Sequence, residues 1–153
     1  MSNDKISRRR QTAFQVLDSY KAWDLDQILA CRTEDCIQQI LPRSLNRPPM
    51  DNTTYRTFFG GVMPYFKNFT PEIDDIVEDE RANKVVIWCH STADTAVGPY
   101  KNEYMLTLHF NEEGDKVTKL YEFVDGANSV DFWPKFWKFL EGEKAKSAAD
   151  ATQ

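Results

Sequence analysis

Residues 104–125 read YMLTLHFNEEGDKVTKLYEFVD and predict two strands joined by a tight turn. In the first and last parts of this segment, apolar residues alternate with polar ones, which is the pattern of strands with one buried face. Between them, residues 111–115 read NEEGD, a composition typical of a turn. We therefore expect strands over residues 101–110 and 116–125 that pair as an antiparallel hairpin.

The same period of two extends upstream and predicts strands at 72–78 and 84–95, with a shorter strand at 36–41 that Pro42 ends. Helical spacing predicts helices over 7–23, near 24–30, from 51 to about 66, and from 129 onward. Ser7, Asp51 and Ser129 are the expected N-caps. Sequential strands form a meander, and amphipathic helices bury their apolar stripes against it. We therefore expect an α+β fold in which a curved antiparallel sheet forms a cone with three to four helices.

The length of 153 residues fits one domain. We place that domain at residues 7–141, after a flexible N-terminus at 1–6. The tail at 142–153 is rich in Lys, Ala, Ser and Asp, and we expect it to be disordered. Phe, Tyr and Trp make up 13% of the chain. That proportion fits either an aromatic core or an aromatic-lined pocket for a planar ligand.

Charge and cysteine usage narrow the class of protein. The net charge of −5 argues against nucleic acid as a partner. The first 30 residues are polar and no apolar run is long enough to span a bilayer, so we expect no membrane partner and a cytoplasmic location. Cys31, Cys36 and Cys89 have neither a disulfide framework nor a metal spacing. No nucleotide-binding loop, serine-hydrolase elbow or zinc-protease motif is present.

Three stretches carry a family resemblance: ILPRSLNRPPMDN at 40–52, STADTAVGPYKNEYM at 91–105 and KLYEFVDGANS at 119–129. Together with the turn GDKV at 114–117 and the strand end FVD at 123–125, they resemble the SnoaL-like branch of the nuclear transport factor-like superfamily. Within it, they are most similar to small fungal isomerases and cyclases of polyketide and meroterpenoid pathways, including tetrahydroxanthone assembly. The resemblance covers residues 7–140.

This resemblance implies acid/base rearrangement of an oxygenated polycyclic small molecule, without metal or redox cofactor. It also implies a homodimer, and the long strand at 84–95, apolar on both faces near its start, agrees because its second face needs a cover. The fold does not decide the function, since a ligand-binding or assembly module, a hydrolase and a dehydratase remain alternatives.

An acid/base isomerase needs a base near the acidic C–H bond and a donor for the developing oxyanion. Asp125 is the first candidate base, because it ends the last strand among aromatic residues and matches the aspartate that related hydrolases and cyclases use there. His90 is the second candidate, and Asp94 on the same strand face is placed to orient it. Glu122 lies on the opposite face from Asp125, where we expect a salt bridge across the sheet.

Arginines on the loop after the first strand are candidates for holding a ligand oxygen. We assign Arg43 to the catalytic group, since the resemblance places this loop near the mouth of the cone. The expected substrate-binding residues are Arg32, Arg47, Tyr55, Phe59, Met63, Trp88, Asn102 and Tyr121.

Overall fold

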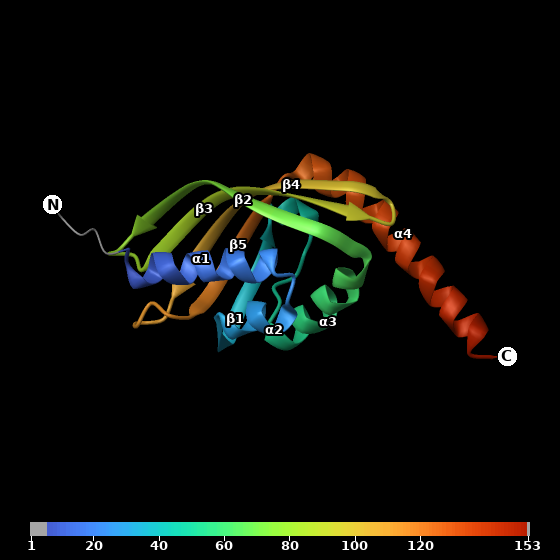
Figure 1. Ribbon diagram of the computed structural model, residues 1–153, viewed down its shortest axis with the longest axis horizontal. Helices are drawn as coiled ribbons and strands as arrows, with labels where there is room; N and C mark the ends of the chain where they lie inside the picture. The colour runs from blue at the N-terminus through green and yellow to red at the C-terminus, as the bar shows by residue number, and fades with distance from the viewer. Residues whose placement is uncertain (1–5, 153) are drawn as a thin grey trace.

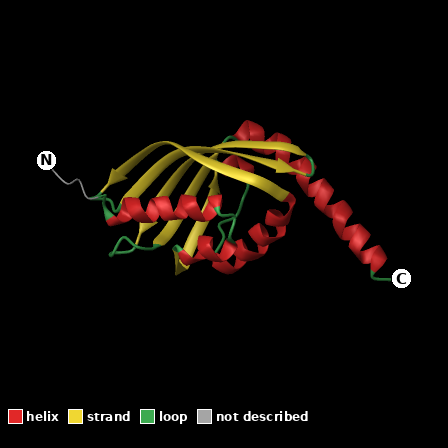
Figure 2. Cartoon of the chain, viewed as in Figure 1, coloured by secondary structure: helices red, strands yellow, loops and turns green. Residues whose placement is uncertain are grey.

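A computed structural model describes residues 6–152 and shows a curved five-stranded sheet with helices along its inner side (Figures 1 and 2). The strand order in the sheet is β1-β5-β4-β3-β2. In chain order the elements are α1 (Arg8–Lys21), α2 (Leu25–Ala30), β1 (Arg32–Leu41), η1 (Arg43–Leu45), α3 (Asn52–Val62), η2 (Met63–Tyr65), β2 (Phe66–Asp79), β3 (Lys84–Thr95), β4 (Gly98–Phe110), β5 (Val117–Val124) and α4 (Gly126–Asp150), where η denotes a 3-10 helix. The expected α+β cone is confirmed.

Strands β2 to β5 form the predicted antiparallel meander. The edge strand differs from the expectation, because β1 pairs with β5 in parallel, with Gln38 opposite Leu120. Helix α3 lies between β1 and the meander of β2 to β5, so β1 cannot join the sheet through a hairpin. It returns instead to the free edge of the last strand, and this long connection permits parallel pairing. The sheet is therefore mixed rather than fully antiparallel.

Side-chain caps fix where the helices begin. The Ser7 and Asp51 side chains accept hydrogen bonds from the backbone of Arg10 and Thr54, as predicted for α1 and α3. The last helix begins earlier than expected, because Asp125 rather than Ser129 is its N-cap. None of the helices within residues 6–152 is long and apolar enough to cross a lipid bilayer.

The C-terminal segment also differs from the expectation. Helix α4 continues to Asp150, through much of the tail that we expected to be disordered. Its last turns extend away from the rest of the chain in Figure 1. Lys, Ala and Glu are strong helix formers, so this segment can remain helical while its side chains stay exposed. Of the expected flexible N-terminus, residues 1–5 lie outside the described part.

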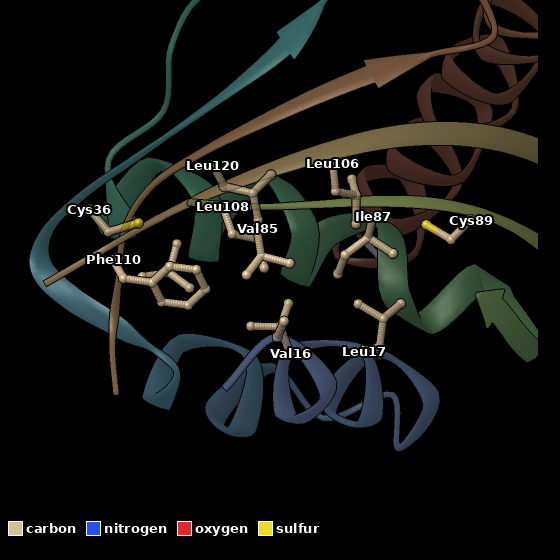
Figure 3. Packing of buried hydrophobic residues seen from close by; sticks show 12 residues of the cluster. Val16, Leu17, Cys36, Val85, Ile87, Cys89, Leu106, Leu108, Phe110 and Leu120 are labelled. Carbon is tan, nitrogen blue, oxygen red and sulfur yellow. The ribbon is translucent and has the colours of Figure 1, made fainter. Parts of the chain in front are cut away.

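One apolar core lies between α1 and the inner face of the sheet. Figure 3 shows Val16 and Leu17 of α1 pointing toward Val85 and Ile87 of β3, all of them buried. Leu108 of β4 is fully buried in the same cluster. This core holds α1 against the sheet, and Leu17, one of its members, also borders the cavity described below.

A second, aromatic core joins α4 to the strands. The Phe66 ring of β2 lies 5.4 Å from the Phe136 ring and 5.9 Å from the Phe132 ring, centroid to centroid. Tyr100 of β4 contacts Phe132 at 4.9 Å in an edge-to-face arrangement. Phe136 is completely buried. The first half of α4 is thus part of the domain, whereas residues after Gly142 are mostly exposed.

Phe136→Ala should strongly lower the stability of the protein, whereas truncation after Gly142 should hardly change it. Thermal unfolding measures both effects. Removing the buried ring should cost about 3–5 kcal/mol and lower Tm by roughly 6–20 °C. Truncation removes exposed side chains and should shift Tm by less than about 2 °C. A truncated chain as unstable as Phe136→Ala would show that the tail belongs to the domain.

Candidate active site

An inner cavity of about 340 Å³ lies between the concave face of the sheet and the helices α1, α3 and α4. Its size is at the small end of ligand-binding sites, about 300–1,000 Å³. Apolar and aromatic side chains form most of its wall. Of the described residues that border it, Glu122 is the single carboxylic acid.

Glu122 reaches the cavity because β5 alternates. Leu120 and Val124 on the same face are buried, so the carboxylate between them also points inward. Because β1 pairs in parallel with β5, Gln38 lies beside Glu122, and Gln38 Nε2 donates to Glu122 Oε2 at 2.7 Å. The carboxylate is therefore fixed by a neighbouring strand.

Arg32 continues this hydrogen-bonded chain behind the cavity wall. Its guanidinium donates to Gln38 Oε1 at 2.5 Å and to the Tyr20 hydroxyl at 3.3 Å. It also lies 4.1 Å from the centroid of the Tyr55 ring. The Tyr20 and Tyr55 hydroxyls are 2.8 Å apart. The buried Arg32 thus compensates the negative charge of Glu122 through one intervening side chain.

Burial raises the pKa of Glu122 above that of an ordinary glutamate. The hydrogen bond from Gln38 and the positive charges of Arg32 and Arg47 oppose this shift without reversing it. A carboxyl with a raised pKa is protonated at a higher pH and can exchange a proton with a bound carbon acid or leaving group. This is the chemistry that the cavity offers.

A second polar group lies on β3 and β4 in the same cavity. The Ser91 hydroxyl is 2.8 Å from the Tyr104 hydroxyl, which is 3.0 Å from the Tyr100 hydroxyl. Asn102 Nδ2 donates to the Tyr100 hydroxyl at 2.8 Å. Three hydroxyl hydrogens serve two hydroxyl–hydroxyl bonds, so one hydrogen is left to donate to a ligand oxygen. Burial raises the pKa of Tyr100 to about 12 and also raises the pKa of Tyr104 well above that of an ordinary tyrosine, so both keep their protons.

The structure brings some of the predicted residues together. Arg47, Tyr55, Phe59 and Asn102 border the cavity, and Arg32 lies behind its wall. The predicted binding role of these residues is compatible with their positions.

Asp125, the predicted base, does not border the cavity. It is exposed, and its carboxylate accepts hydrogen bonds from the backbone amides of Ala127 and Asn128 at the start of α4. Strand alternation places it on the outer side of the sheet, opposite to Glu122. Asp125 therefore stabilises the helix N-terminus.

The predicted pair of His90 and Asp94 also lies on the outer face. His90 is among the residues that border the cavity, but its ring contacts Asp74 at 2.7 Å and Glu72 at 3.3 Å on the neighbouring strand, and these contacts raise its pKa. Asp94 is exposed and accepts a hydrogen bond from Asn68. Ser91 and Cys89, not His90, are the buried residues that face inward on β3.

The remaining predicted residues lie elsewhere. Arg43 is exposed on η1, and Met63 accepts a hydrogen bond at its backbone carbonyl from Trp23 without bordering the cavity. Trp88 is 44% exposed on the outer face, and Tyr121 packs there against His109. Among residues 6–152, no group of three or more His, Cys, Asp and Glu side chains is arranged to hold a metal ion.

Comparisons with known proteins agree with this architecture. No family model matches the chain. Core atranone cluster protein 11 from Stachybotrys chlorohalonatus is 35% identical over 130 residues, which cover 85% of this chain and 97% of that protein. Monooxygenase nsrQ from Aspergillus novofumigatus is 35% identical over 138 residues, which cover 90% of this chain and 91% of its own length.

Solved structures give the same result. BvnE pinacolase from Penicillium brevicompactum matches with a TM-score of 0.81 at 34% identity, covering 86% of this chain and 95% of that chain. A protein named as a SnoaL-like polyketide cyclase, from Shewanella denitrificans, shares the fold with a TM-score of 0.68 at 11% identity, covering 80% of this chain and 94% of that chain. The protein belongs to the fungal family of core atranone cluster protein 11, nsrQ and BvnE, and its fold is SnoaL-like. The expected family and fold are thus confirmed.

The SnoaL-like cavity contains one acid that the sequence interpretation misassigned. We expected Glu122 to form a salt bridge across the sheet. It shares its strand face with Leu120 and Val124, and a carboxylate on the more apolar face of a strand was the signal available in the sequence. Choosing the strand-end Asp125 instead followed the family motif rather than the hydrophobic face.

Glu122→Gln should change how the stability of this SnoaL-like protein depends on pH. A raised pKa means that the folded state binds the proton more tightly than the unfolded state, so wild-type stability falls as pH rises from the ordinary glutamate pKa through the raised value. Glu122→Gln should lack this fall and should therefore unfold at a higher temperature than wild type at higher pH. Thermal unfolding across pH measures it, with the exposed turn variant Glu112→Gln as control. Parallel wild-type and Glu122→Gln profiles would contradict the raised pKa.

Proposed function

We propose that this protein is a cofactor-independent isomerase or cyclase that acts by general acid/base catalysis on an oxygenated polycyclic intermediate of fungal secondary metabolism. The observation that carries the proposal is Glu122, a carboxylate with a raised pKa in an apolar cavity, held by Gln38. Enzymes commonly raise a glutamate pKa in this way for proton transfer near neutral pH.

The chemistry divides between the two polar groups of the cavity. Glu122 exchanges a proton with the substrate carbon or oxygen at one wall. The free hydroxyl hydrogen of the Ser91–Tyr104–Tyr100 chain donates to a carbonyl oxygen and stabilises the negative charge that forms there. Because the remaining wall is mainly aromatic and aliphatic, it suits a flat, largely apolar ring system.

The names of relatives support a rearrangement and raise one alternative. BvnE is named as a pinacolase, and AusH and PrhC are further solved neighbours, with TM-scores of 0.73 and 0.80. Several curated relatives carry the name monooxygenase. An oxygenation would also begin from a carbanion that Glu122 forms by removing a proton from the substrate. Dioxygen consumption should therefore be measured together with isomerisation.

We also propose that the protein works as a homodimer joined through the outer face of the sheet. Trp88, Met105 and Phe123 are direct cross-strand neighbours there and are 44%, 44% and 51% exposed. Three adjacent large apolar side chains at the centre of a sheet form a patch that a partner would cover. We call these three residues the outer patch.

Charge on both sides of the outer patch favours a second copy as the partner. Lys84, His109 and Lys119 form one cross-strand row. On the other side lie Glu72 and Glu103, which flank His90 in register. A two-fold axis through the outer patch would place the basic row of one copy over the acidic row of the other, as an isologous interface requires.

Substitution of Glu122 tests the proposed reaction. We expect dearomatised polyketide or meroterpenoid ketones to isomerise, or to incorporate deuterium from heavy water, with wild-type protein. Glu122→Gln should lower kcat by about 10²- to 10⁴-fold, because it removes the acid/base group while leaving its shape. Mass spectrometry and NMR of the product measure both effects.

Asp125→Asn is the matched control, since asparagine also caps helices and Asp125 lies outside the cavity. It should retain wild-type kcat. Activity lost in Asp125→Asn but retained in Glu122→Gln would reverse the assignment. Ligand binding without turnover or exchange would favour a binding module, and stoichiometric dioxygen uptake would favour an oxygenation.

Met105→Glu should dissociate the proposed dimer, because it buries a charge at the centre of the outer patch. Analytical ultracentrifugation measures the change in mass. Val130→Glu is the control, since Val130 is 63% exposed and lies on α4 beside the inner cavity, not in the outer patch. A wild-type monomer, or a Met105→Glu variant that remains dimeric, would argue against this interface.

A further inference from the structure

We infer that Arg47, together with the rings of Phe58, Trp133 and Trp137, forms a subsite for an anionic oxygen group of the ligand, such as a carboxylate or an enolate. We call this set the Arg47 subsite. The inference rests on the proposed function only in treating the ligand as the substrate.

Aromatic rings enclose the Arg47 guanidinium. Its central carbon lies 5.2 Å from the centroid of Phe58 and 5.9 Å from those of Trp133 and Trp137. The two indole rings stack at 5.2 Å, and Phe58 lies 5.8 Å from Trp137. All four residues border the cavity. The rings stabilise the cation and hold its plane, which leaves its N–H donors directed at other partners.

Those donors have no protein acceptor within residues 6–152. Neither a carboxylate within 4.0 Å nor a hydrogen bond of the Arg47 side chain is found in that part of the chain. Arg47 is half-buried, and this desolvation lowers its pKa. A partly desolvated guanidinium without a carboxylate has donors available for a ligand anion, and its planar fork matches a carboxylate.

The charge balance of the site points the same way. Two guanidiniums, Arg32 and Arg47, act on Glu122, so the group carries an excess positive charge even when Glu122 is ionised. Arg32 is already bonded to Gln38 and Tyr20. Arg47 borders the cavity and Arg32 does not, so Arg47 is the cation that a bound anion can reach.

The loop that carries Arg47 is held in place for this role. Asn46 adopts a left-handed conformation, and two prolines, Pro48 and Pro49, follow Arg47. At the end of the loop Met50 exchanges both backbone hydrogen bonds with Gln38, at 2.8 and 2.9 Å. Gln38 also holds Glu122. The subsite and the acid/base group are thus anchored to the same residue and can act on one ligand.

A matched pair of planar probes tests the charge requirement without turnover. Anthraquinone-2-carboxylate and its methyl ester differ in charge but share the ring system. We expect wild-type protein to bind the carboxylate at least about tenfold more tightly than the ester, the difference that one charge-assisted contact produces. Quenching of tryptophan fluorescence measures Kd, since two indoles line the subsite.

Arg47→Gln should abolish the preference for the carboxylate, and Arg47→Lys should retain part of it because the charge remains. Arg43→Gln, on the same loop but exposed, should leave the preference unchanged. Equal binding of both probes by wild type, a preference that survives Arg47→Gln, or binding of neither probe would overturn the inference. The Kd of dimedone, which is an enolate at neutral pH, is measured in the same way. Comparing its Kd with that of the carboxylate probe shows which anion the subsite prefers.

The outcome is separable from that of the proposed function. If Glu122→Gln retained turnover while Arg47→Gln lost the carboxylate preference, the catalytic role of Glu122 would be wrong and the subsite would stand. The reverse pattern would remove the subsite alone.

Discussion

Gln38 connects the three parts of the molecule on which the site depends. Its backbone pairs with Met50 and fixes the loop that carries Arg47, while its side chain accepts from Arg32 and donates to Glu122. An amide can do both at once because it has a donor and an acceptor at one end. Without it, a buried guanidinium and a carboxylate would lose their shared partner, and the free energy of leaving such charges unpaired is large.

The hydrogen bond between Gln38 and Glu122 also depends on the register in which β1 pairs with β5. In this register Gln38 lies opposite Leu120, two residues from Glu122 on the same strand. A shift of one residue would turn Gln38 to the outer face and leave the carboxylate without its donor. The core packing and the hydrogen-bonded chain therefore select the same register.

The two faces of the sheet have separate roles because side chains alternate along each strand. The inner face carries Ser91, Tyr104 and Glu122, enclosed by helices and removed from bulk water. In this environment, the hydrogen bonds of the hydroxyl chain and those of the carboxylate are each stronger than they would be in water. The outer face carries His90 with its carboxylate partners and the outer patch. Substitutions on the two faces of one strand would thus alter the proposed catalysis and the proposed assembly independently.

The amino-acid sequence was enough to predict the element order, the antiparallel meander, the caps at Ser7 and Asp51, and the family. Those features depend on local spacing and on residues close in the chain. The sequence also predicted Arg47, Tyr55 and Asn102 as binding residues, and these border the cavity. The parallel pairing of β1 and the choice of Glu122 over Asp125 were decided only by tertiary structure. Alternation shows that a strand has two faces, but which face meets the helices depends on contacts between segments as distant as Gln38 and Glu122.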